Sequence, residues 1–338
     1  MAPERVDFVA RWNLDRTHRH PELGSVRELV RRAMERPTPN RPVPGAVSLL
    51  RELGRTNARV HVISGSTSRL RTQVEDGLRL DRVRWDELSL VPNLPDLLGL
   101  RGRGFRSELG GRLALLLETR IRDQQLSETA NEPPEILIGD DARADAYLYS
   151  LYADILTGRV DRSSLKRVLA HGGVRGAQAD RCLESLARLV QGLVVERILI
   201  RLDRQAPPSS YDQLGVRLVP FYNYLQAALM LLEDHRLDAA AVVRVASTFA
   251  VRHGFDHEAM ARSYLDLMRR GHAHGAAAEP LRAAVERLED DAGPQPALAS
   301  LRRTCDLLDQ YAQTPPERVE RHAGEVDYAA LARRYRRQ

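Results

Sequence analysis

The feature of this 338-residue sequence that most restricts its fold is a set of short apolar segments that each end in polar residues. They are VDFVARW (6–12), ARVHVISGS (58–66) and PPEILIGDDARAD (133–145). Apolar residues at helical spacing separate them and predict helices over 25–36, 45–55, 69–78, 110–128 and 146–158. Apolar strands that alternate with helices indicate a doubly wound α/β fold, in which helices cover both faces of a parallel sheet.

Polar residues gather where the predicted strands end. Asn13 and Asp15 follow the first strand, residues 64–66 end the second, and Asp140 and Asp141 end the third. Ligands of such sheets bind beyond the carboxyl ends of the strands. We therefore expect these residues to meet at one edge of the sheet and to form a binding site there.

Four segments also match a family pattern: WNLDRT (12–17), VHVISGS (60–66), GGRLALLLETR (110–120) and EILIGDDARAD (135–145). Through them the chain resembles the haloacid dehalogenase (HAD) superfamily and, within it, the phosphatidate-phosphatase-type catalytic domains of bacteria and fungi. The resemblance covers roughly residues 5–160 and implies a HAD-like phosphatase domain over 1–160. Phosphoryl transfer in such a domain needs a carboxylate nucleophile, an acid/base, a divalent cation and donors to the transferring oxygens.

In the first two motifs, the resemblance assigns roles residue by residue. Asp15 stands at the position of the general acid/base, and Thr17 fits the closing position of the first motif. Asn13 occupies the nucleophile position, where the family has aspartate. Ser64, with Gly65 beside it, would bind the phosphoryl oxygens.

The remaining motifs supply a cation and the metal ligands. The family has a lysine in its third motif, and Arg112 is the substitute that we assign here. Asp140 would bind Mg²⁺ directly, with Asp141 and Asp145 as further ligands or supports. Asn13 could offer its carbonyl oxygen to the same ion, because Mg²⁺ prefers oxygen ligands.

Two departures from the family pattern predict impaired catalysis. The amide of Asn13 cannot readily form an acyl phosphate, and Arg112 keeps the charge of a lysine but changes its geometry. His18 and His20 lie close to the missing nucleophile, but solvated loop residues are the favoured interpretation. We expect a HAD-like protein that is impaired or inactive as a phosphohydrolase and retains a pocket for a phosphoester and Mg²⁺. The alternatives are an active Mg²⁺-dependent phosphatase, acting on a phosphatidate-like or other phosphomonoester, and a non-catalytic regulatory protein.

The second half of the chain, 161–338, is predicted to be an all-α helical domain without strands. The expected helices are 185–203, 222–235, 239–254, 257–271, 280–290 and 297–312. This domain could cover the phosphate pocket, bind a protein partner or form a homo-oligomer. A regulatory protein would act through it.

Composition restricts partners and location. The net charge is +5, and 50 of the 51 basic residues are arginines, with Lys166 the single lysine. The arginines alternate with acidic residues, a pattern that is typical of solvated helix faces. Aromatic residues make up 5% of the chain, too few to favour base stacking, so no nucleic acid is expected. Cys182 and Cys305 lack metal or disulfide spacing. No transmembrane segment is expected, and a phosphorylated small molecule or lipid in the cytoplasm is the expected ligand.

Overall fold

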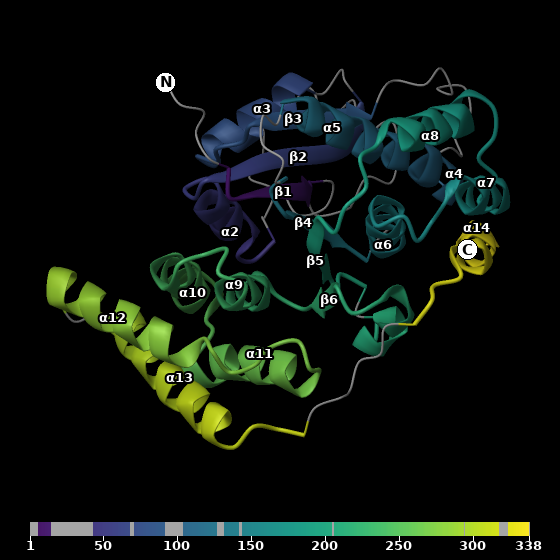
Figure 1. The fold of residues 1–338 in the computed structure, drawn as a ribbon. Helices are drawn as coiled ribbons and strands as arrows, with labels where there is room; N and C mark the ends of the chain where they lie inside the picture. Colours follow the sequence, from purple (N-terminus) through teal and green to yellow (C-terminus); the bar gives the residue numbers. More distant parts are fainter. Residues whose placement is uncertain are drawn as a thin grey trace, which may run out of the picture.

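Six parallel strands form the centre of the protein. The computed structural model describes residues 6–14, 43–67, 71–91, 104–126, 132–141, 144–204, 206–293, 295–317 and 324–337. The strands are β1 (Phe8–Asn13), β2 (Ala58–Thr67), β3 (Glu87–Val91), β4 (Glu135–Asp140), β5 (Val195–Arg201) and β6 (Leu218–Phe221). Their order in the sheet is β3-β2-β1-β4-β5-β6, and every pairing is parallel (Figure 1).

This order reverses direction at β1. The chain moves outward from β1 through β2 to β3, then returns across β1 and continues through β4, β5 and β6. It is the doubly wound order 3-2-1-4-5-6, in which ligands bind at the point where the order reverses. The predicted α/β class with a parallel sheet is therefore confirmed. The point of reversal lies between the ends of β1 and β4.

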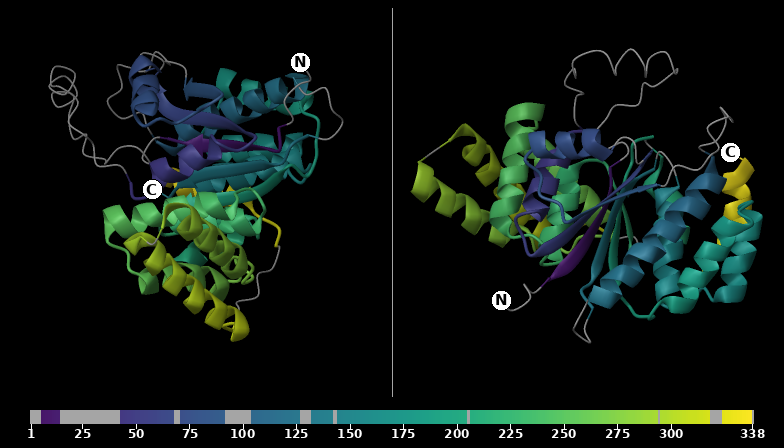
Figure 2. Two further views of the ribbon diagram at one scale, coloured as in Figure 1. Left: turned by 90° about the vertical axis from the view of Figure 1, so that its left-hand side faces the viewer. Right: turned by 90° about the horizontal axis from the view of Figure 1, so that it is seen from above.

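Alternation along the strands explains why both faces of the sheet are covered. Phe8, Ala10 and Trp12 of β1 face one apolar core, whereas Arg11 and Asn13 point to the other face. The first core contains side chains of α2 (Ala46–Leu53), α3 (Arg71–Leu80), α9 (Tyr224–Glu233) and α10 (Ala239–His253). The second contains side chains of α5 (Leu113–Leu126), α6 (Asp145–Leu156), α7 (Arg162–His171) and α8 (Ala177–Arg188). The sheet seen from above has helices on both sides (Figure 2).

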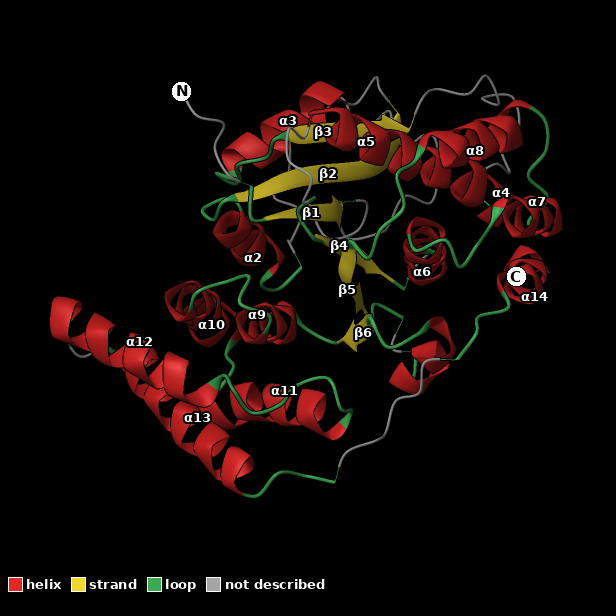
Figure 3. Cartoon of the chain, in the orientation of Figure 1, coloured by secondary structure: helices red, strands yellow, loops and turns green. Residues whose placement is uncertain are grey.

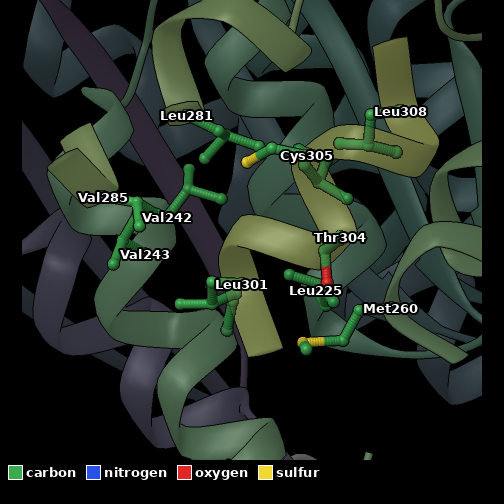
Figure 4. Close-up of a pocket in the computed structure, with 12 residues that line it drawn as sticks. Leu225, Val242, Val243, Met260, Leu281, Val285, Leu301, Thr304, Cys305 and Leu308 are labelled. Atoms are coloured by element: carbon green, nitrogen blue, oxygen red, sulfur yellow. The ribbon is translucent and has the colours of Figure 1, made fainter. Parts of the chain in front are cut away.

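Three further helices form an outer layer against α9 and α10. They are α11 (His257–Arg269), α12 (Ala278–Ala292) and α13 (Pro296–Gln313). A cavity of about 20 Å³ lies among α9–α13 (Figure 4). It has the size of about one water molecule. Its walls are aliphatic or sulfur-containing apart from Thr304, whose hydroxyl already donates to the Ser300 carbonyl. The cavity is therefore an imperfectly filled core.

The last helix, α14 (Tyr328–Arg337), returns to the sheet domain and packs on α7 (Figure 1). The Tyr328 hydroxyl donates to Asp154 at 2.8 Å, and the Tyr147 hydroxyl donates to the Tyr328 carbonyl at 3.0 Å. Tyr335 stacks on Phe105 with 5.3 Å between ring centroids. α14 is therefore held beside the short helix α4 (Phe105–Ser107), next to a segment of the candidate site.

The second half of the chain contains strands, although the sequence predicted only helices there. β5 and β6 lie beyond residue 160 and complete the same sheet (Figure 3). The helix predicted over 185–203 is wrong: α8 ends at Arg188, and the apolar run that follows forms β5. β3 was not predicted. The helix predicted over 25–36 lies outside the described residues.

No helix within the described part of the chain is long and apolar enough to span a membrane.

Candidate functional site

The candidate site lies at the carboxyl ends of β1 and β4, where the strand order reverses. Asn13 is the last residue of β1, and Asp140 is the last residue of β4. Both side chains are buried, with 1% and 2% of their surface exposed. The parallel register pairs Trp12 with Ile138, one residue before Asn13 and Gly139. The fold thus places the two strand ends side by side, as the sequence predicted.

The Asn13 amide is bound to a carboxylate. Its Nδ2 donates to Oδ2 of Asp145 at 2.5 Å. Asp145 is the first residue of α6 and is fully buried. The same carboxylate oxygen accepts the backbone N–H of Asp140 at 3.2 Å. Asp145 therefore links the ends of β1 and β4 to the start of α6.

Gly139 makes this close approach possible. A Cβ atom at residue 139 would lie 2.9 Å from both Cβ and Cγ of Asp145. Real Cβ atoms do not tolerate such a contact, so only glycine leaves room for the carboxylate against the strand. The glycine of the sequence IGDD thus has a role that its position alone did not reveal.

Arg112 reaches Asp145 from the opposite side. Its NH1 lies 2.5 Å from Oδ1 of Asp145 and 2.7 Å from Oε2 of Glu108. Glu108 and Arg112 are the ends of a π-helical turn, η3 (Glu108–Arg112), that leads into α5. Such turns occur frequently at functional sites. The sequence predicted Arg112 but missed Glu108, which its spacing of four residues before Arg112 could have suggested.

Asp140 and Asp141 point elsewhere. Asp141 accepts the backbone N–H groups of Asp203 and Arg204 at 2.7 and 2.9 Å and so anchors the loop after β5. Asp140 follows Ile136 and Ile138 on the alternate positions of β4, on the face opposite Asp145. Burial lowers the pKa of Arg201, but the nearby Tyr224, Asp203 and Asp140 outweigh this effect and raise it. Asp140 therefore belongs to the electrostatic surroundings of Arg201.

The other predicted site residues are only partly described. Ser64 is buried near the end of β2, and Gly65 follows it in the same strand. Asp15, Thr17, His18 and His20 lie outside the described residues. Of the predicted set, the structure brings Asn13, Arg112 and Asp145 into contact.

These residues do not fit a Mg²⁺ ion in their present arrangement. Oδ2 of Asp145 already accepts the Asn13 amide and the Asp140 backbone N–H, Oδ1 is paired with the charge of Arg112, and Asp141 anchors the loop after β5. In the described part of the chain, the carboxylates of Asp140, Asp141 and Asp145 do not converge on a common point; His61, Glu87 and Asp123 do. Mg²⁺ demands near-octahedral oxygen ligands.

The converging group of His61, Glu87 and Asp123, on β2, β3 and α5, is also unsuited to a metal ion because of the hydrogen bonding of its histidine ring. His61 Nε2 lies 3.8 Å from Glu87 and 3.7 Å from Asp123. Its Nδ1 lies 3.0 Å from Arg11 NH1, which can only donate, so the neutral ring carries its proton on Nε2. A metal-binding histidine normally donates its second ring N–H to an acceptor. Burial and the Arg11 charge lower the pKa of His61, which keeps this neutral ring in place.

Arg11 is the centre of a buried ionic network beneath the site. It contacts Glu135 through Nε and NH2 at 3.0 and 2.9 Å, and Asp123 at 2.6 Å. Arg120 adds a contact to Glu135 at 3.1 Å, and the Tyr152 hydroxyl donates to Glu135 at 2.9 Å. Removing such paired charges from water is costly unless every partner is present. The network is therefore expected to make stability sensitive to pH.

Stability is expected to fall steeply between about pH 4.5 and pH 2, because of Glu135. Burial alone would raise the pKa of Glu135, but Arg11, Arg120 and Tyr152 lower it from 4.5 to about 2. A depressed folded-state pKa stabilises the protein above the unfolded value, and this contribution is lost as the pH falls toward the folded value. Urea titrations from pH 7 to pH 3 should show a flatter decline for Glu135→Gln than for the wild type. Glu258→Gln, at an exposed ion pair, should follow the wild type. Parallel declines of the wild type and Glu135→Gln would contradict this prediction.

Comparison of the chain with protein-family models, with curated proteins and with solved structures finds no match. The contacts at the ends of β1 and β4 are therefore the basis for a functional proposal.

Proposed function

We propose that this chain is a HAD-like phosphatase-fold protein that binds a phosphoester at the carboxyl ends of β1, β2 and β4 and does not hydrolyse it. The observation that carries the proposal is the bond from the Asn13 amide to Asp145, at the point where the strand order reverses. A binding position there agrees with the general rule for open α/β sheets. The amide of Asn13 at the end of β1 agrees with binding of a phosphoester that is not hydrolysed.

The chemistry of residue 13 supports the loss of hydrolysis. A covalent phosphoryl intermediate needs a carboxylate oxygen or an equivalent nucleophile. An amide nitrogen that donates to a carboxylate is not nucleophilic, and Asn13 uses its nitrogen in this way. Asp145 accepts the Asn13 amide on Oδ2 and is paired with the Arg112 charge through Oδ1, so it is not placed to act as the nucleophile instead.

Binding of a phosphoester is supported by the polar and charged groups at this edge. Arg112 supplies a buried positive charge, and Ser64 supplies a hydroxyl at the end of the neighbouring strand. The N-terminus of α6 begins at Asp145 and adds a partial positive charge. Arginine is well suited to phosphate oxygens because its guanidinium is planar and permanently charged.

Two measurements, binding and hydrolysis, distinguish the possible functions. Both are made with an aryl phosphate and with a short-chain phosphatidate. We expect the wild type to bind the phosphoester and to release no phosphate with Mg²⁺ above the level of Asp145→Ala. Ser64→Ala should weaken binding about tenfold, the loss of roughly one hydrogen bond to a charged group. Glu258→Gln removes a negative charge from an exposed ion pair and serves as the net-charge control for Asp145→Ala.

Two results would overturn the proposal. Mg²⁺-dependent turnover by the wild type, lost in Asp145→Ala, would show an active phosphatase. Absence of both binding and turnover, with a folded protein, would remove the phosphoester site and direct attention to α10–α13 as a partner-binding region.

A further inference from the structure

Four buried side chains form a continuous series at the candidate site. The Asn13 amide donates to Asp145, Arg112 forms an ion pair with Asp145, and the Arg112 guanidinium also donates to Glu108. They come from β1, α6 and the two ends of η3. None of the four has more than 7% of its surface exposed, so water does not screen their interactions.

The donors around Asp145 occupy positions that a cation would take. Oδ1 faces the Arg112 guanidinium at 2.5 Å, and Oδ2 faces the Asn13 amide at 2.5 Å and the Asp140 backbone N–H at 3.2 Å. A divalent ion bound to Asp145 would have to displace both side-chain donors. It would also approach the positive charge of Arg112 at short range.

Residue 13 decides which arrangement is stable. Asparagine and aspartate have nearly the same shape, so the backbone at the end of β1 can accept either. With aspartate, two carboxylates would face each other across the 2.5 Å that now joins the Asn13 amide to Asp145. Two such charges need a cation between them, because like charges in a buried site repel.

We propose that the Asn13 amide and the Arg112 guanidinium together replace a divalent cation at Asp145. The wild-type site therefore works without a metal ion, and with Arg112 unchanged the group at residue 13 decides whether the site needs one. The part of this inference that concerns phosphoester binding rests on the proposed function. The part that concerns the metal rests only on the contacts of Asp145.

Mn²⁺ alone, titrated against the folded full-length protein at pH 7, is the probe. Free Mn²⁺ is measured by electron paramagnetic resonance for the wild type, Asn13→Asp, Asp145→Asn and the double variant Asn13→Asp/Asp145→Asn. We expect one site in Asn13→Asp that binds about 100-fold more tightly than any site in the wild type, because affinity rises steeply with the number of charged ligands. The double variant should return to the wild-type value. Any ion at His61, Glu87 and Asp123 contributes equally to all four proteins and cancels.

The wild type provides an independent test if Asn13→Asp fails to fold. Asp145→Asn should leave wild-type Mn²⁺ binding unchanged, and a chelator should leave the affinity for the aryl phosphate unchanged. Wild-type Mn²⁺ binding that is lost in Asp145→Asn would overturn the inference, as would a folded Asn13→Asp with no gain in affinity. Failure of the wild type to bind the aryl phosphate would overturn the proposed function but not the result for the metal.

Discussion

Replacement of Arg11 by methionine is expected to lower the free energy of unfolding by about 3–5 kcal/mol, the range measured when one partner of a buried ion pair is removed. Arg11 is completely buried and makes two contacts with Glu135 and one with Asp123. Methionine fills similar space but leaves both carboxylates without this charge. Arg120 still contacts Glu135 and Arg59 still contacts Asp123, so we expect the lower part of the range.

Two further variants show whether geometry or charge causes the loss. Arg59→Met removes a partly exposed arginine that contacts the same Asp123 at 3.3 Å, and it should cost less than about 1 kcal/mol. Arg11→Lys keeps the charge but cannot contact Glu135 through two nitrogens, so it should fall between the other two. Urea denaturation followed by circular dichroism measures all three. Equal losses for Arg11→Met and Arg59→Met would show that burial of the network does not set its contribution.

The strands that the sequence predicted are those whose burial is visible in their composition. β1, β2 and β4 have apolar runs that end in polar residues; β1 and β4 are buried throughout, and so are Val60, Val62 and Ile63 of β2. β5 was mistaken for a helix because Glu196 and Arg197 interrupt its apolar run. Arg236 contacts Glu196 and Arg197 contacts Asp234, so partners about 40 residues away allow two charges in one strand. No local pattern contains that information.

The types of residue at the candidate site could be predicted from the sequence, but the directions in which their side chains point could not. Asn13, Arg112 and Asp145 lie in contact in the structure, joined by a hydrogen bond and an ion pair. Asp140 leaves the set because side chains alternate along β4, and Asp141 leaves it because its partners are backbone N–H groups of the loop after β5. Both effects depend on the packed fold. The Arg11 network was missed for the same reason, since its partners are 50 to 124 residues distant.

Exchange of the two groups at residues 13 and 145 is expected to restore stability that either single change removes. Asn13→Asp places two buried carboxylates at the position of a 2.5 Å hydrogen bond and should cost about 3 kcal/mol in a metal-free buffer. Asp145→Asn leaves Arg112 with Glu108 as its remaining charged contact in this series and should cost about 2 kcal/mol. In the double variant an amide again faces a carboxylate, with the donor now on residue 145.

The double variant should therefore lie within about 2 kcal/mol of the wild type, which gives a coupling energy of roughly 3 kcal/mol, at the upper end of the range for residues in contact. Full recovery is not expected, because the Asp140 backbone N–H would face the new amide nitrogen where Oδ2 now accepts it. The same exchange at the exposed pair of Glu258 and Arg262 should show no coupling beyond a few tenths of a kcal/mol. Additive losses at residues 13 and 145 would mean that the Asn13–Asp145 bond does not hold the strand ends together. Strong coupling, together with Mn²⁺ binding by Asn13→Asp alone, would show that the Asn13 amide, together with Arg112, keeps this site free of metal.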